Sequence, residues 1–160
     1  MSLAGAALAQ PAAPTPALPT PDFVKAAAQT DAFEIQEGSL AAKQGSTARV
    51  RDFGSMMVTD HTKTTAGLKA ALHTARLPPP APPQLSDDQK ANLATLQGLH
   101  GTAFDKAYIA EQISAHQTAL GVMTAYAASG DNAELRKAAG ETVPVVKHHL
   151  EVAQQIEAGT

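Results

Sequence analysis

The stretch Pro78-Pro79-Pro80-Ala81-Pro82-Pro83 decides how this chain folds, because a helix cannot continue through consecutive prolines. On each side of it lie two long segments in which apolar residues recur every three or four positions. That spacing is typical of amphipathic helices, and the abundance of alanine favours the same structure. The sequence therefore predicts an all-α protein built from two helical hairpins.

Tight turns at Gly45-Ser46 and at Ser129-Gly130-Asp131 make the two helices of each hairpin antiparallel. Thr20 or Asp22 can cap the first helix, and Pro144 is expected to kink the last helix or to separate its first turns. The four long helices are expected at residues 22–44, 47–76, 101–128 and 133–158.

The connection between the hairpins is long enough to cross the bundle from end to end. The proline-rich run extends about 20 Å, and a short helix at residues 87–96, capped by Ser86, adds about 15 Å. An up-down-up-down arrangement would need only a few residues at this point. We therefore expect a ferritin-like antiparallel four-helix bundle, in which a crossover containing the short helix makes the second and third long helices parallel.

Four polar residues lie near the middle of the long helices, on or beside their apolar stripes. In the second helix, for example, His61 lies on the apolar stripe that includes Phe53, Met57 and Leu68. A buried imidazole costs free energy unless its ring nitrogens are satisfied. In the expected topology the four residues lie within a band of about 12 Å along the bundle axis. The sequence therefore predicts one shared metal site with the ligands Glu34, His61, His116 and His149.

Three imidazoles and one carboxylate suit Zn, Fe, Mn or Cu(II). A ferritin-type di-iron centre needs Glu-x-x-His on two helices, and that pattern is absent from the chain. Di-iron oxidase chemistry is therefore disfavoured, no catalytic residue is predicted, and an enzyme is not the expected class. Four further residues are expected to orient the ligands through hydrogen bonds: Glu37, Asp60, Asp105 and Tyr108.

A second hypothesis stays open, because a histidine on an apolar stripe is often a satisfied core residue. The histidines would then form a buried hydrogen-bond network with Glu34 and Asp60 that specifies the helix register. Under this hypothesis the protein is a structural or interaction module of the cell envelope and holds no metal.

Composition narrows the classes of partner. The chain has a formal net charge of -3 and no basic run, so nucleic acid is not an expected partner. It has no cysteine, which removes disulfides and thiolate ligands. No stretch approaches the roughly 20 apolar residues of a transmembrane segment. A protein partner or a second copy of the chain is compatible with the sequence.

The first residues indicate export. Ala7-Leu8-Ala9 has the small-x-small pattern of a signal-peptidase site, and prolines crowd the residues that follow it. Residues 1–21 are therefore expected to be a signal-peptide remnant and a disordered Pro-rich tether, and residues 22–158 a single bundle domain. The expected location is the periplasm or another exported compartment.

Several blocks of the sequence form a recognisable pattern. They are Phe23-Val24, Glu34-Ile35-Gln36-Glu37-Gly38-Ser39-Leu40-Ala41, Met57-Val58-Thr59-Asp60-His61-Thr62, Phe104-Asp105-Lys106-Ala107-Tyr108, His116-Gln117 and Val143-Pro144 with His149-Leu150. Through them the chain resembles the bacterial domain-of-unknown-function family 4142, exported proteins with a ferritin-like bundle. The resemblance covers roughly residues 22–157.

This resemblance implies a fold and export, and it implies no particular activity. The chain departs from the pattern at Ala115, where an aspartate is common, which argues against a carboxylate next to His116. His100 and His148 look individual to this chain. The positions that match the recurrent polar residues of the family are Glu34, Asp60, His61, His116 and His149.

Overall fold

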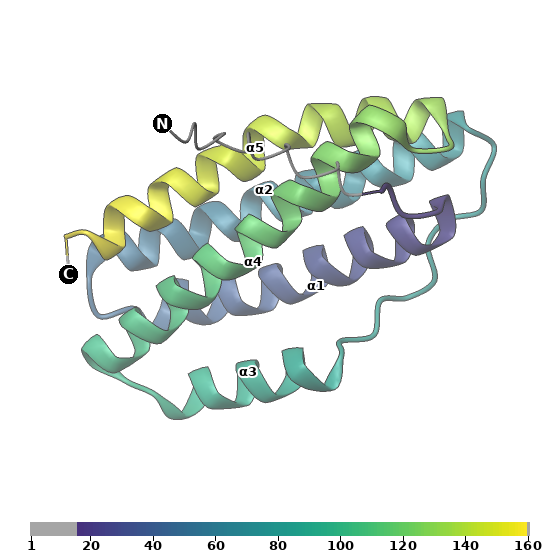
Figure 1. Cartoon of the computed structure of the whole chain (residues 1–160). Helices are drawn as coiled ribbons and strands as arrows, with labels where there is room; N and C mark the ends of the chain where they lie inside the picture. Colours follow the sequence, from purple (N-terminus) through teal and green to yellow (C-terminus); the bar gives the residue numbers. More distant parts are fainter. Residues whose placement is uncertain (1–15, 160) are drawn as a thin grey trace, which may run out of the picture.

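The computed structural model describes residues 16–159, and these residues form five helices and no strand. Figure 1 shows a bundle of four long helices with a shorter helix along its edge. None of the described helices combines the length and the hydropathy needed to cross a bilayer. The predicted all-α helical bundle is confirmed. Its helices are α1 (Thr20–Gln44), α2 (Ala48–Thr74), α3 (Asp87–Gly98), α4 (Gly101–Ser129) and α5 (Ala133–Glu157).

Polar side chains at the helix ends explain where three of the helices begin. The side chains of Thr47 and Asn132 each accept a hydrogen bond from the backbone amide three residues further on. Ser86 and Gln89 exchange the two reciprocal bonds of a capping box at the start of α3. Each bond satisfies an amide that no helical carbonyl can reach.

The two antiparallel hairpins, α1–α2 and α4–α5, are tied to each other at both ends of the bundle. At one end Asp105 of α4 accepts hydrogen bonds from the backbone amides of Ser46, at 2.8 Å, and Thr47 in the α1–α2 turn. At the other end the backbone amide of Thr20 donates to Asp131 in the α4–α5 turn. Consequently α2 and α4 begin at the same end of the bundle and run parallel, as can be followed in Figure 1.

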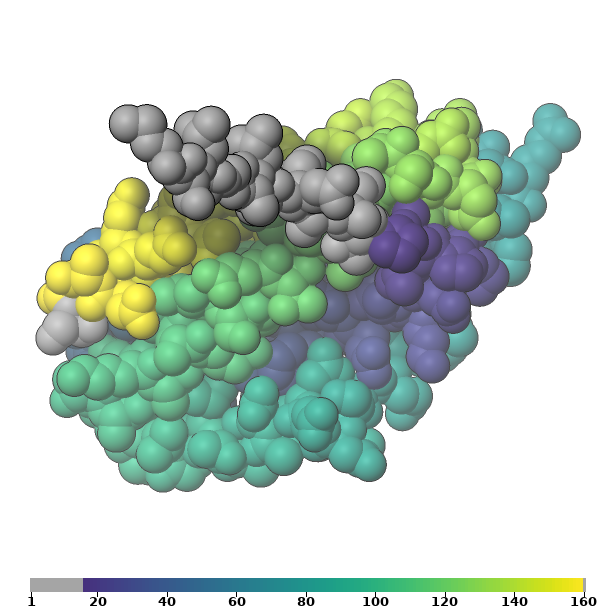
Figure 2. Space-filling view, in the orientation of Figure 1, coloured from purple at the N-terminus to yellow at the C-terminus, as the bar shows by residue number. Residues whose placement is uncertain are grey.

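The segment between α2 and α4 runs along α1. Gln29 donates to the carbonyl of Gln84 near one end of the bundle. Gln44 donates to the carbonyls of Leu96, at 3.2 Å, and Leu99 near the other end. Helix α3 lies against α1 and α4 and forms the lower edge of the molecule in Figure 2. The proline-rich segment and α3 thus form the connection between the two parallel helices.

A layer of buried polar residues crosses the middle of the bundle between two apolar clusters. One cluster, next to the α1–α2 turn, includes Phe53, Phe104 and Tyr108. The other, next to the α4–α5 turn, includes Phe23 and Tyr126, whose stacked rings lie 3.8 Å apart. Each long helix passes from one cluster to the other. Between the clusters lies the central polar layer: Asp31, Glu34, Glu37, His61, Gln112, His116 and His149.

Some local expectations are wrong. Helix α1 already includes Thr20, and neither Thr20 nor Asp22 caps it. Helix α5 is continuous through Pro144, so its first turns are not separated. Pro144 has no N–H to donate to the carbonyl of Gly140, one turn earlier in the helix. Gly140 and Pro144 are both exposed, so water can donate to this carbonyl instead. The expected signal-peptide remnant and most of the tether fall in residues 1–15, outside the described residues.

Helices α1 and α2 approach each other closely at two glycines. A Cβ atom on Gly54 would lie 2.7 Å from the carbonyl oxygen of Gly38 and 2.7 Å from the backbone nitrogen of Ala42. These neighbours are backbone atoms, which cannot rotate out of the way. The missing side chains therefore set the spacing of the two helices, one of which carries Asp31 and the other His61 of the polar layer.

The substitution Gly54→Ala is expected to lower the free energy of unfolding by about 1–3 kcal/mol, because the helices must separate to admit the methyl group. Gly67 on the same helix is a matched control, since an added Cβ there meets no atom within 4 Å. Gly67→Ala should raise the stability by up to about 1 kcal/mol through helix propensity. Urea unfolding followed by circular dichroism measures both changes, and equal midpoints for the two variants would contradict the prediction.

Candidate metal centre

Three of the four predicted ligands meet in the central polar layer. His61 of α2, His116 of α4 and His149 of α5 each offer one ring nitrogen, and these three atoms lie within 4.8 Å of one another. The ring centroids are 5.3 to 5.9 Å apart. All three side chains are buried. Because they come from three helices, the cluster exists only in the folded bundle.

Asp31 determines which nitrogen of His61 carries the proton. Nδ1 of His61 lies 2.8 Å from Oδ1 of Asp31. Oδ1 also accepts a hydrogen bond from the hydroxyl of Thr64, and Oδ2 accepts one from the hydroxyl of Thr65. Because a carboxylate only accepts, Nδ1 is the donor, and the neutral ring keeps its lone pair on Nε2. This Nε2 atom is buried and has no hydrogen-bond partner.

A backbone carbonyl orients His116. Its Nδ1 donates to the carbonyl oxygen of Gln112, one helical turn earlier, at 2.8 Å. The lone pair of the neutral ring is therefore on Nε2. Burial, and then the neighbouring His149 and His61, lower the pKa of His116 to about 3. The ring is consequently neutral at physiological pH.

His149 is oriented by Asp60 of α2. Its Nε2 donates to Oδ2 of Asp60 at 3.2 Å, so the lone pair is on Nδ1, which is buried and has no partner. Burial lowers the pKa of His149, although the hydrogen bond that the ring donates to Asp60 acts in the opposite direction. Asp60 also accepts from Lys63 at 2.9 Å. That Asp60 orients a metal ligand stays a prediction.

These hydrogen bonds leave each ring with one unprotonated nitrogen available for the shared centre. Within residues 16–159 nothing donates to Nε2 of His61 or to Nδ1 of His149. A buried acceptor without a partner costs about 1–3 kcal/mol. Histidines that bind a metal have this same arrangement, in which the other ring nitrogen donates to a carboxylate or a backbone carbonyl. The three side chains therefore fit a metal ion.

The chemistry of the donors narrows the choice of metal. Imidazole nitrogens suit Zn, Cu, Fe and Ni, whereas Mn prefers oxygen. A tetrahedral ion with nitrogens at about 2.0–2.1 Å holds those nitrogens about 3.3 Å apart. The rings, whose ligand atoms lie within 4.8 Å of one another, would move slightly inward to reach that geometry. The carboxylates of Asp31 and Asp60, bound to two of the rings, offset the charge of a divalent ion.

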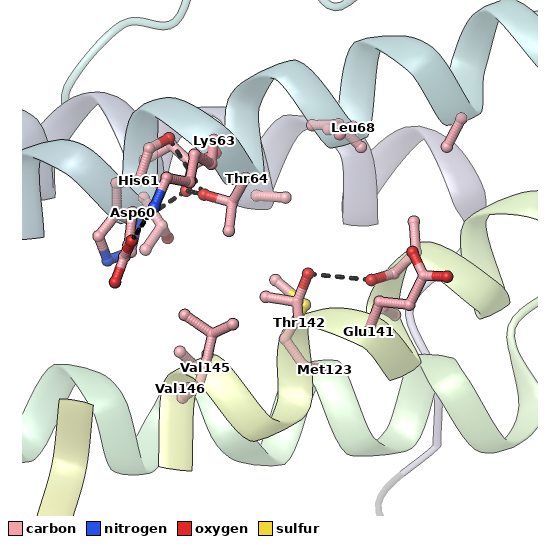
Figure 3. A pocket seen from close by; sticks show the side chains of 18 of the residues that line it. Asp60, His61, Lys63, Thr64, Leu68, Met123, Glu141, Thr142, Val145 and Val146 are labelled. Carbon is pink, nitrogen blue, oxygen red and sulfur yellow. Dashed lines mark hydrogen bonds and ion pairs between the residues drawn. The ribbon is translucent and has the colours of Figure 1, made fainter. Parts of the chain in front are cut away.

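An open cleft of about 550 Å³ gives access to this cluster. All four long helices line it, and its lining includes both His61 and His149. Figure 3 shows Asp60 and His61 at one end of the cleft, with Val145 and Val146 of α5 on the opposite wall. An ion or an additional small ligand can therefore approach the histidines without unfolding of the bundle.

Glu34, the fourth predicted ligand, lies in the central polar layer but bonds to a different group. Its Oε2 accepts a hydrogen bond from Nε2 of Gln112 at 2.7 Å, and it is not among the converging ligand atoms. Glu37 accepts from the same amide at 3.1 Å, and the hydroxyl of Tyr108 has no partner. Asp105 bonds to the α1–α2 turn instead. Within the described part of the chain, none of these four side chains forms a hydrogen bond with the three histidine rings, and their roles at a shared centre stay predictions.

Sequence reasoning missed Asp31 and Gln112, for different reasons. Asp31 is one turn before Glu34 on α1, so both residues lie on the same face of that helix. This spacing could have identified Asp31 as a further polar residue of the site. Gln112 acts on His116 through its backbone carbonyl, which any residue supplies. No sequence signal could therefore identify its role in orienting the ring.

Two solved structures share this fold. CopM in the Cu(I)-bound form aligns with a TM-score of 0.73 and 13% sequence identity, over 89% of this chain and 97% of that chain. A DUF305 fragment from Deinococcus radiodurans aligns with a TM-score of 0.75 and 16% identity, over 91% of this chain and 100% of that chain. At such low identities the likeness shows the fold alone.

Comparison of the sequence with curated proteins finds no match. The family model described as Domain of unknown function (DUF4142) matches residues 5–156, a range that contains the whole central polar layer. The resemblance inferred from the sequence blocks is thereby confirmed. The chain belongs to the DUF4142 family.

Proposed function

We propose that this protein binds one copper or zinc ion through His61, His116 and His149 in the core of the bundle. The observation that supports this most is the orientation of the rings. Each ring donates one N–H to an oxygen of the chain, which leaves one unprotonated nitrogen on each neutral ring. One ring nitrogen of each histidine lies within 4.8 Å of the others. A metal ion is the partner that such a group lacks. Among divalent ions copper forms the strongest complexes with nitrogen donors.

Binding and release of the ion is the role that we propose, rather than catalysis. Three protein ligands leave a coordination position free, and the cleft next to His61 and His149 would let an incoming ligand take that position. CopM carries Cu(I) in a bundle of the same fold, which supports copper as a candidate without implying shared ligands. The signal-peptidase pattern at Ala7-Leu8-Ala9 supports a role in metal storage or buffering in an exported compartment.

The second candidate is a metal-free module in which the polar layer only fixes the register of the helices. The hydrogen bonds of the three ring N–H groups favour it, because each already has an acceptor. However, a hydrogen-bond network pairs donors with acceptors, and here the remaining nitrogens are all acceptors. This candidate predicts a thermal midpoint that chelators do not change.

Metal-free protein without a histidine tag should bind one Cu²⁺ or Zn²⁺ per chain after equilibration and dialysis, as measured by elemental mass spectrometry. His61→Ala and His116→Ala should each lose the ion, because two nitrogens of a flexible pair bind it far more weakly than three fixed ones. His73→Ala is the matched control, since His73 is an exposed residue of α2. Equal metal content in all variants that retain the native circular dichroism spectrum would refute the proposed ligands.

The substitution Asp31→Asn should weaken binding of the ion by about 10- to 100-fold, because an amide no longer holds the proton on Nδ1 of His61. Asp52→Asn, at an exposed position of α2, should leave the affinity unchanged. Competition with a chromophoric chelator measures both affinities. An unchanged affinity in the Asp31 variant would show that orientation of the ring by this carboxylate does not matter for binding.

In the metal-free protein His116 should contribute a loss of stability as the pH falls from about 6.5 to about 3, because the unfolded state binds a proton on His116 that the folded state excludes. The loss due to this ring is at most about 1.4 kcal/mol per pH unit. Glu34 acts in the opposite direction between pH 4.5 and about 7, because burial raises its pKa to about 7.

Comparison with His116→Gln isolates the contribution of the ring from that of the carboxyl groups. The stability of the unsubstituted protein minus that of this variant should decrease as the pH falls through the same window. Urea unfolding of both proteins at several pH values provides the measurement. A difference that is constant with pH would mean that His116 is not held neutral.

A further inference from the structure

A second group of polar residues lies between α1 and α4. The side-chain nitrogen of Gln112 is within hydrogen-bond distance of three carboxylates: 2.7 Å from Glu34, 3.1 Å from Glu37 and 3.0 Å from Glu111. An amide group has two hydrogens, so it cannot donate to all three at once. The amide of Gln112 therefore cannot supply a hydrogen to each of the three carboxylates.

These three carboxylates also lack an ion pair, although the charge of His61 acts to lower the pKa of Glu34. Within residues 16–159 no nitrogen of Lys, Arg or His forms an ion pair with Glu34, Glu37 or Glu111. Glu34 is 1% exposed and Glu37 is 0% exposed. Burial, the largest cause in both cases, raises the pKa of Glu34 to about 7 and raises that of Glu37 further. Buried carboxylates normally have a cationic partner, and these do not.

Further oxygens in the same place have no partner. They belong to the hydroxyl of Tyr108, to Oε1 of Glu37 and to Oε1 of Gln112, and all are buried. Tyr108 is 0% exposed and lies one helical turn before Glu111 and Gln112 on α4. After burial, the charges of Glu34, Glu37 and Glu111 are the next causes that raise the pKa of Tyr108. Rotation of the Gln112 amide would present its oxygen to them in place of its nitrogen.

We propose that Glu34, Glu37 and Glu111 form a second metal site, with Tyr108 and Gln112 as additional oxygen donors, for a hard divalent cation such as Mn²⁺. Oxygen donors alone suit Mn²⁺, Mg²⁺ and Ca²⁺, whereas copper and zinc favour nitrogen or sulfur. The cation provides the charge that the carboxylates lack and a partner for the unsatisfied oxygens. This oxygen site uses none of the three histidines and does not depend on the function proposed for them.

The oxygen site lies between α1 and α4, and its partly exposed member provides a route for a cation from solvent. Glu34 and Glu37 are three residues apart on α1, so their side chains lie on one face. Glu111 is the half-buried member of the three, and it connects the site to solvent. The alternative occupant is a set of shared protons, which would keep the carboxyl groups neutral and leave no place for a cation.

Titration of the metal-free full chain with Mn²⁺, followed by the electron paramagnetic resonance signal of the free ion, decides between a cation and protons. We expect the unsubstituted protein to bind one Mn²⁺, and Glu37→Gln and Glu111→Gln each to weaken that binding by about tenfold or more, since affinity follows the number of charged ligands. Glu151→Gln, at an exposed position of α5, is the matched control and should bind Mn²⁺ like the unsubstituted protein.

His149→Ala makes the two metal sites distinguishable. It should bind Mn²⁺ with unchanged affinity while losing the copper or zinc ion, and Glu111→Gln should show the reverse. Because Glu111 is partly exposed, its variant tests the oxygen site even where Glu37→Gln does not fold. Absence of Mn²⁺ binding at millimolar concentration, or equal Mn²⁺ affinity in the Glu111 variant, would overturn the proposal and favour shared protons.

Discussion

The arrangement of the helices depends on satisfying the polar groups buried in the middle of the bundle. A buried polar group without a partner costs about 1–3 kcal/mol, a large fraction of the roughly 5–15 kcal/mol that stabilise a typical domain. The bond of His61 to Asp31 connects α2 to α1, and the bond of Gln112 to Glu34 connects α4 to α1. The bond of His149 to Asp60 connects α5 to α2. A shift of any helix by one turn would break these bonds, so the polar layer selects one register.

Within this layer, nitrogen and oxygen donors are segregated, and Gln112 stands at the boundary between them. Its backbone carbonyl holds the proton of His116, while its side chain faces the carboxylates of Glu34, Glu37 and Glu111. Metal ions sort between such donor sets by hardness, since copper and zinc prefer imidazole and Mn²⁺ prefers carboxylate. One short stretch of α4 thus contributes to two chemically different environments.

The helices, the turns and the convergence of the three histidines could be predicted because they follow from local spacing. Apolar periodicity places His61 and His116 on inward faces, and consecutive prolines end α2 whatever their surroundings. The position of Glu34 could not be predicted in the same way. The position of a residue along the bundle axis does not determine which neighbouring helix its side chain contacts. The side chain of Glu34 contacts Gln112 of α4. The sequence was equally ambiguous for Asp105, because its position next to the α1–α2 turn becomes visible only in three dimensions.

The two apolar clusters allow the central layer to be less than fully satisfied. One packs around Phe53, Phe104 and Tyr108 and the other around Phe23 and Tyr126, on opposite sides of the polar layer. An ion that binds only the native state adds about 2.7 kcal/mol at a concentration a hundredfold above its dissociation constant. That gain is comparable to the cost of one or two unpartnered nitrogens. A bundle held at both ends can carry this cost without the ion, so the proposed metal would exchange through the cleft while the helices stay packed.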